Sequence, residues 1–339
     1  MHSLNRSSRR ALGAAALLLA ATLTACGSPA ATPSPAPSES VTATPAASDT
    51  ATPSPAASPT PVPVSNAIDS ITVNGAAGSA PAVSVPAPFA IDETRSSTLS
   101  PGTGPEAGAD SIVEVNYVGV NARTGATFDS SWERGQPALF SLEQVVPGFT
   151  KGLTGAQPGE RVLVVMPGSD GYDGSGGNAQ AGIEVGDSLV FAIDVLAVSV
   201  KTVTGATGTE QPPVTLGDEG GKPTVTIPAG AALPTANSAT TMIRGAQRAV
   251  GSNDYVMVHY RSWSWKTGRL IEDKFETPDA GQIAETIPGF RDGVVGQPIG
   301  SRVVVVAPDA YPTGHPDLGV EAGDTMVYVV DILFSSAVS

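Results

Sequence analysis

From residue 113 onward, polar and apolar side chains alternate with a period of two. Val113, Val115 and Tyr117 are apolar, whereas Glu114 and Asn116 between them are polar. Successive side chains of a β-strand point to opposite faces, so this pattern predicts a strand with one buried face. A later stretch has the same period and places four side chains on one face: Leu189, Phe191, Ile193 and Val195.

One short helix is predicted between these strands. It follows Pro147 and Gly148 and covers about Phe149 to Gly155, where the glycine is a stop signal. A sheet with an apolar face must bury that face, so a β-rich sheet wrapped around the single helix is the expected architecture.

The second half of the chain repeats the first. Val115-Asn-Tyr117 returns as Val258-His-Tyr260, 143 positions later. Other echoes are 78–86 with 220–228, 146–149 with 287–290, and 186–194 with 323–331. Two repeats of this length predict two similar domains rather than a solenoid of short repeats.

The repeat and the composition together set the predicted boundaries. The first domain is 66–200, with an extension over 66–100 that is expected to add an edge strand, and the second domain is 214–339. Between them, 201–213 is a polar linker that ends in Pro-Pro.

The first 25 residues have the layout of a secretory signal. Arg6, Arg9 and Arg10 form a basic region, and the apolar run from Ala11 to Leu23 is followed by small residues. The next residue after this signal, Cys26, follows Leu-Thr-Ala in a pattern that resembles the lipobox of bacterial lipoproteins, which implies lipidation of its sulfur. The protein is therefore expected to be exported and lipid-anchored to the outer face of the cell membrane.

Residues 26–65 are rich in Pro, Ala, Ser and Thr. Such a segment buries too little apolar surface to offset chain entropy, which predicts a disordered tether. A glycosylated stalk has a similar composition, and the sequence does not separate the two.

Charge and residue counts exclude several function classes. The formal net charge is −14, which argues against nucleic-acid binding and against attachment to a membrane by basic residues. With three histidines and one cysteine in the chain, we expect neither a metal site nor a cofactor.

An ordered set of motifs runs through the first domain, from about Asp110 to Val198. It includes Val115-Asn-Tyr117, Phe128-Asp-Ser-Ser-Trp132, Val145-Val-Pro-Gly-Phe149 and Leu189-Val-Phe191, with Arg134, Phe140, Pro167 and Tyr172 between them. In this order the motifs resemble the FKBP family of peptidyl-prolyl cis-trans isomerases. The resemblance implies an α+β fold with two FKBP-like half-barrels, each an antiparallel β-sheet around one short helix, after the disordered tail.

The resemblance also implies an apolar pocket and a role for each residue in it. The catalytic group would be Asp129, Tyr172, Tyr117 and Phe191, and the substrate-binding group would be Phe128, Arg134, Phe140, Val145, Val146, Phe149 and Ile183. The Val146 N–H and the Tyr172 hydroxyl would hold substrate carbonyls, and Asp129 would stabilise the rotated amide. The family usually carries Trp at the pocket floor, where this chain has Phe149.

A plainer interpretation applies to part of this set. Aromatic and branched side chains on one strand face are ordinarily core, which fits Phe128, Phe140 and Val145 as well as a binding role does. Asp129 is different, because a carboxylate in an apolar neighbourhood needs a partner. The Tyr117 hydroxyl and Arg134 are the expected partners.

The second copy differs from the first at the residues that are expected to bind and act on the substrate. Phe128-Asp129 becomes Ile271-Glu272, the region of Phe140 becomes Asp279-Ala-Gly-Gln, and no arginine stands where Arg134 does. Isomerase activity is therefore expected in the first domain only, with peptide binding or support as the role of the second.

The expected function is isomerisation of X-Pro bonds in exported polypeptides during folding, with macrolides of the FKBP-ligand class as further ligands. One alternative is a non-catalytic lipoprotein that uses the same pocket to capture peptides or unfolded segments. Another is a structural lipoprotein that keeps the fold as a scaffold, which the Phe149 departure favours slightly.

Overall fold

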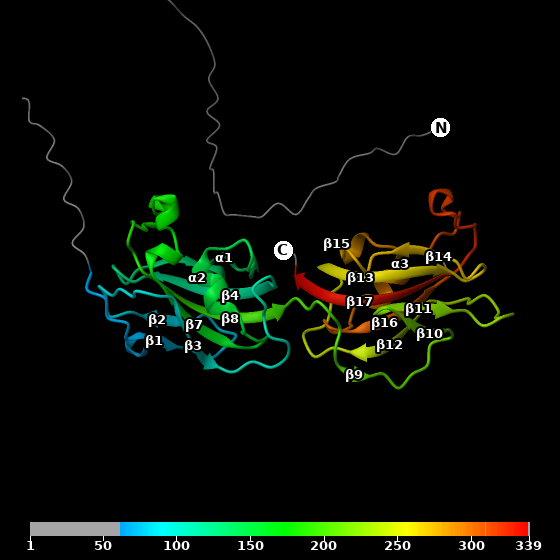
Figure 1. The fold of residues 1–339 in the computed structure, drawn as a ribbon, viewed down its shortest axis with the longest axis horizontal. Coiled ribbons are helices and arrows are strands. Elements are labelled where there is room, and N and C mark those ends of the chain that lie inside the picture. Colours follow the sequence, from blue (N-terminus) through cyan, green and yellow to red (C-terminus); the bar gives the residue numbers. More distant parts are fainter. Residues whose placement is uncertain (1–61, 309, 338–339) are drawn as a thin grey trace, which may run out of the picture. The chain divides into compact units, whose positions relative to one another are not determined.

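The computed structural model describes residues 62–308 and 310–337 (Figure 1). The predicted signal peptide, Cys26 and the tether up to residue 61 lie outside the described residues. Within the two described ranges, no helix is both long and apolar enough to cross a membrane.

The first domain begins earlier than predicted. Val64 forms a parallel bridge with Ala90, and the Ser65 N–H donates to the carbonyl of Ala90 at 2.9 Å. Residues 62–65 were assigned to the tether by composition, but this backbone pairing makes them part of the domain.

The sheet of the first domain is antiparallel and has two long apolar strands at its centre. In spatial order the strands run β3-β7-β8-β4-β5, and β6 also pairs with β4 (Figure 1). The strand at the edge, β3, comes from the extension, as expected. The bounds are β3 (Arg95–Ser100), β4 (Ile112–Asn121), β5 (Thr127–Ser130), β6 (Ala138–Ser141), β7 (Arg161–Met166) and β8 (Leu189–Val198).

This sheet is buried on both faces, so the prediction of one buried face is wrong. A small hairpin of β1 (Thr72–Asn74) and β2 (Ala82–Ser84) precedes β3. Ile71, Phe89 and Ile91, which flank this hairpin, pack on one face of the sheet with Val118, Val120, Leu163, Val165 and Val190. The extension therefore buries the face that the strand pattern alone would leave to solvent.

The predicted helix lies on the other face and is shifted by two residues. It is α2 (Pro147–Leu153), which begins with proline, a residue whose missing N–H costs nothing at a first helical position. Gly148 and Gly152 face Met166 and Val164 of β7 so closely that a Cβ at either position would clash. An additional helix, α1 (Ser131–Arg134), was not predicted.

The second domain repeats this strand order as β12-β16-β17-β13-β14, with β15 paired to β13. The linker is not wholly outside it, because β9 (Ala206–Thr207) pairs with β12 and extends the sheet. A hairpin of β10 and β11 corresponds to β1 and β2. The bounds are β10 (Thr215–Glu219), β11 (Lys222–Thr226), β12 (Ser238–Arg244), β13 (Asp254–Ser264), β14 (Leu270–Asp273), β15 (Asp279–Gln282), α3 (Pro288–Val294), β16 (Arg302–Ala307) and β17 (Met326–Ala337).

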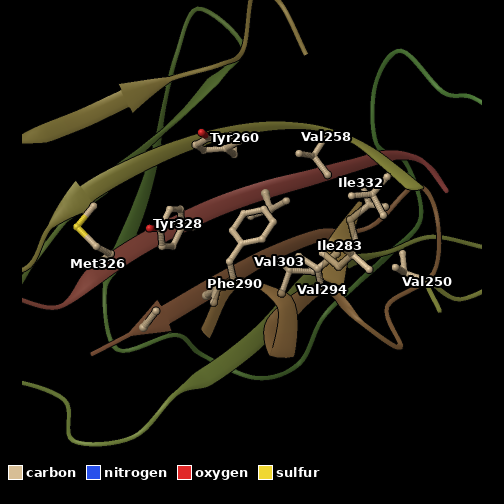
Figure 2. Packing of buried hydrophobic residues seen from close by; sticks show 14 of the residues in the cluster. Val250, Val258, Tyr260, Ile283, Phe290, Val294, Val303, Met326, Tyr328 and Ile332 are labelled. Atoms are coloured by element: carbon tan, nitrogen blue, oxygen red, sulfur yellow. The ribbon is translucent and has the colours of Figure 1, made fainter. Parts of the chain in front are cut away.

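The fold is thus α+β, with antiparallel sheets and three α-helices in the described residues. Short 3₁₀ turns complete it, at Ile68–Ser70, Gly168–Asp170, Asp173–Ser175, Ala179–Ala181, Ile283–Glu285 and Pro316–Leu318. In the core of the second domain, Phe290 of α3 packs against both Tyr260 and Tyr328 (Figure 2).

Candidate active site

Five aromatic rings from β4, β5, β6, β8 and α2 meet in the first domain. Phe191 lies at the centre, with ring centroids 4.6 Å from Phe149, 5.6 Å from Phe128 and 6.1 Å from Tyr117. Phe140 contacts the rings of both Phe149 and Tyr117. The sheet and helix therefore bring together five of the six aromatic residues that were predicted for the pocket, all but Tyr172.

Gly119 on β4 makes room for this cluster, and the sequence reasoning missed it. A Cβ at this position would lie 2.8 Å from the Phe128 ring and 2.9 Å from the Phe191 ring. A glycine inside an apolar strand often marks a close approach of this kind, so the signal was present.

Asp129 follows Phe128 on β5 and is held by two groups. The Tyr117 hydroxyl donates to one carboxylate oxygen, and Arg134 forms an ion pair with the other. Arg134 also donates to the Tyr117 hydroxyl at 3.0 Å, which closes a triangle of three polar side chains. Both partners expected for Asp129 are therefore in contact with it.

The short helix α1 explains how Arg134 reaches back to Asp129. Ser130 caps its N-terminus by accepting from the Glu133 N–H, and Gly135 ends it in the left-handed conformation at φ 74°. One turn of helix thus places residues 129 and 134 side by side.

Ser131 is a second residue that the sequence reasoning missed. It is fully buried, and its hydroxyl accepts from the Tyr117 N–H at 2.8 Å and donates to Asn116 at 2.9 Å. This serine fixes α1 to β4 beside Tyr117, so it positions the Tyr117 backbone.

Burial and hydrogen bonding together shift the pKa values of Tyr117 and Arg134. Burial, and then the hydrogen bond to Asp129, raise the pKa of Tyr117, so the phenol stays a neutral donor. Burial acts to lower the pKa of Arg134, but its contacts with Tyr117 and Asp129 outweigh this and raise it. The guanidinium therefore neutralises the Asp129 carboxylate.

The remaining predicted residues lie around the same aromatic cluster. Ile183 is buried, and Val145, Val146 and Tyr172 are partly buried against the same core. The Tyr172 hydroxyl and the Val146 N–H make no hydrogen bond within the described part of the chain. Burial and the nearby Asp129 charge raise the pKa of Tyr172, so it too remains a neutral donor.

The comparisons with known proteins point to one family. The model of the FKBP-type peptidyl-prolyl cis-trans isomerases matches residues 104–196. A probable FK506-binding protein of Corynebacterium glutamicum is 35% identical over 117 residues, which cover 34% of this chain and 97% of that protein. The FK506-binding protein of Streptomyces anulatus is 40% identical over 99 residues, covering 29% of this chain and 79% of that protein.

The chain belongs to the FKBP-type peptidyl-prolyl cis-trans isomerase family. The predicted FKBP pocket, from Tyr117 to Phe191, lies entirely within the matched residues. Among solved structures, FkpA from Escherichia coli is similar at 32% identity, covering 31% of this chain and 47% of that one, with a TM-score of 0.29. In the described residues of this FKBP-type protein, no group of three or more His, Cys, Asp or Glu side chains could hold a metal ion.

Proposed function

We propose that the first FKBP domain catalyses rotation about X-Pro peptide bonds by binding the twisted amide more tightly than either planar isomer. The observation that carries this proposal is the polar triangle of Asp129, Tyr117 and Arg134 against a cluster of five aromatic rings.

Catalysis of this rotation requires a binding site of suitable shape and polarity and no reactive side chain. Rotation of an X-Pro bond meets a barrier of roughly 18–20 kcal/mol, because amide resonance must be broken. No bond to a nucleophile is formed, and about 5.5 kcal/mol of preferential binding would give roughly 10⁴-fold acceleration. An apolar pocket favours the twisted amide, because that form is less polar than the planar one.

Each polar group around the aromatic cluster has a role in this mechanism. The Val146 N–H and the Tyr172 hydroxyl, neither of which makes a hydrogen bond among residues 62–308 and 310–337, donate to substrate carbonyls. Asp129 stabilises the rotated amide electrostatically while Tyr117 and Arg134 hold its carboxylate in place. The prolyl ring of the substrate packs against Phe191, Phe149 and Phe140.

We assign the activity to the first domain only. In the second, Glu272 replaces Asp129 and accepts from Tyr260 at 3.2 Å, and no ion pair with Glu272 forms among the described residues. The longer Glu272 side chain would place its carboxylate at a different position relative to a bound amide. We therefore propose that this domain binds peptides without catalysing their isomerisation efficiently.

A protease-coupled assay with a proline-containing peptide tests the proposal on the full chain. We expect catalysed isomerisation that stops on addition of a macrolide of the FKBP-ligand class. Asp129→Asn should reduce the activity, and its counterpart Glu272→Gln should not. Peptide binding without catalysis would favour the alternative, a lipoprotein that only captures polypeptides.

We further propose that the protein is exported and acts on exported, proline-containing polypeptides from a lipid anchor at Cys26. The lipobox-like sequence supports this, as does a net charge of −14, which disfavours electrostatic attachment to anionic membranes. Membrane fractionation of cells that express the full chain or Cys26→Ser should show the anchor lost in the variant. An unchanged distribution between the fractions would refute the anchor.

A further inference from the structure

The second domain contains a cavity of about 200 Å³ at the position that corresponds to the FKBP pocket. Phe290, Val256 and Ile287 form its apolar wall, and Tyr260 and Tyr328 bring hydroxyls to it. Figure 2 shows Phe290, Tyr260 and Tyr328 side by side in this region. The site is therefore not filled by its own core.

A glycine opens the cavity where the first domain has a phenylalanine. Val113 of β4 pairs with Phe140, and Val256 of β13 pairs with Gly281; each valine lies four residues before the pocket tyrosine. Gly281 thus occupies the place of Phe140. A Cβ added at Gly281 would meet nothing within 4 Å, so the space of the missing ring is open.

Tyr328, one of the residues that line this cavity, carries a buried hydroxyl. Tyr328 occupies the strand position of Phe191 and is 3% exposed, and its hydroxyl makes no hydrogen bond of normal geometry in the described chain. The Tyr311 hydroxyl contacts it, and this weak hydrogen bond acts on the pKa of both phenols but falls short of normal geometry. A buried hydroxyl that makes no hydrogen bond of normal geometry costs stability, and a polar group of a ligand in the cavity would complete its hydrogen bonding.

Two carboxylates line the cavity, those of Glu272 and Asp279. Glu272 is contacted by the hydroxyls of Tyr260 and Ser262, and Asp279 by the adjacent Ala280 N–H. Neither carboxylate forms an ion pair with a described residue, whereas Asp129 in the first domain is neutralised by Arg134. Burial, followed by the charges of Glu272 and Asp279, raises the pKa of Tyr260, so the phenol adds no further charge.

We infer that this cavity binds a polypeptide segment through a lysine or arginine side chain. The alkyl stem would lie on Phe290 and Val256, and the cationic head would meet Glu272 and Asp279. Its N–H groups would also donate to the Tyr328 hydroxyl oxygen, which can accept as well as donate. That the ligand is a polypeptide rests on the proposed function, whereas the preference for a cation rests on the charges of this site alone.

Binding of labelled peptides to the full chain tests the inference. Three probes of the form Ala-Ala-X-Pro-Phe, with X as Lys, Leu or Glu, are compared by fluorescence anisotropy. We expect the Lys peptide to bind about threefold to tenfold more tightly than the Leu peptide, with the Glu peptide weakest. Raising the salt concentration should reduce this preference, because partly exposed charges are screened.

Three variants locate the preference. Glu272→Gln with Asp279→Asn should abolish the discrimination between Lys and Leu, and Gly281→Phe should remove it by filling the cavity. Circular dichroism checks that each remains folded. Asp129→Asn is the matched control, since it removes a carboxylate from the other pocket and should leave the preference unchanged.

Several outcomes would overturn the inference. These are equal affinity for the Lys and Glu peptides, a preference that disappears in Asp129→Asn, or competition by n-butylammonium as strong as by the Lys peptide. The isomerase assay separates this result from the proposed function. Gly281→Phe should retain isomerase activity, because the substitution lies in the second domain. If the parent chain has no isomerase activity but still prefers the Lys peptide through Glu272 and Asp279, only the proposed function is refuted.

Discussion

Replacing Asp129 by asparagine separates the charge of the polar triangle from its shape. The amide keeps the size of the side chain and can still accept from the Tyr117 hydroxyl, but the ion pair with Arg134 is lost. The Asp129 and Arg134 side chains are 30% and 32% exposed, so solvent screens the pair. We therefore expect the variant to lose about 1 kcal/mol of stability or less.

The expected effect on turnover is larger than the effect on folding. Two full charges 4 Å apart interact by about 4 kcal/mol at an effective dielectric constant of 20. A twisted amide carries only partial charges, and Arg134 offsets part of the Asp129 field. About a third of that energy, ~1.4 kcal/mol, corresponds to a roughly tenfold fall in kcat/KM.

Two measurements on the full chain check this prediction. A protease-coupled isomerase assay gives kcat/KM, and thermal unfolding gives the change in stability. Asp92→Asn is the matched control, because this substitution removes the same charge. Asp92 is 55% exposed and pairs with Arg95, away from the aromatic cluster. If Asp129→Asn retains full turnover while folded, Asp129 has no electrostatic role in the reaction.

Three further predictions concern packing and pH. Gly119→Ala should cost about 1–3 kcal/mol of stability and lower isomerase activity, since its methyl group would press on Phe128 and Phe191; unchanged urea midpoint and activity would contradict this. Phe191→Ala should cost about 3–5 kcal/mol, because the ring is 2% exposed, and a thermal midpoint within a degree of the parent would refute it. Burial acts to raise the pKa of Asp187, but hydrogen bonds led by the one from Arg123 outweigh it and lower the pKa below its ordinary 3.8. The Asp187 carboxylate therefore stabilises the fold above pH 3.8, and this stabilisation is lost as the pH falls through the lower pKa of the folded state. Urea titrations of Asp187→Asn and the parent chain should differ by about 1–3 kcal/mol at pH 7 and converge below pH 3.8, whereas a constant difference would count against this reasoning.

The sequence by itself determined the family, the repeat and the residues that meet in the aromatic cluster and polar triangle of the first domain. This was possible because the motif residues lie on strands, where the period of two decides which face each side chain occupies. It was also possible because Asp129 and Arg134 are only five residues apart, so a single helical turn brings them together. The altered chemistry of the second copy, with Glu272 for Asp129 and no arginine, was equally readable from the aligned repeat.

Only the tertiary structure decided what depends on contacts between distant segments. The strand pattern predicted one buried face, but the extension before β3 covers the other, a contact that no local period encodes. The roles of Gly119 and Gly281 also follow from their neighbours rather than from their own residue type: rings press on the first, and empty space surrounds the second. A glycine has no side chain to indicate its environment, so that difference appears only when the packed strands are in place.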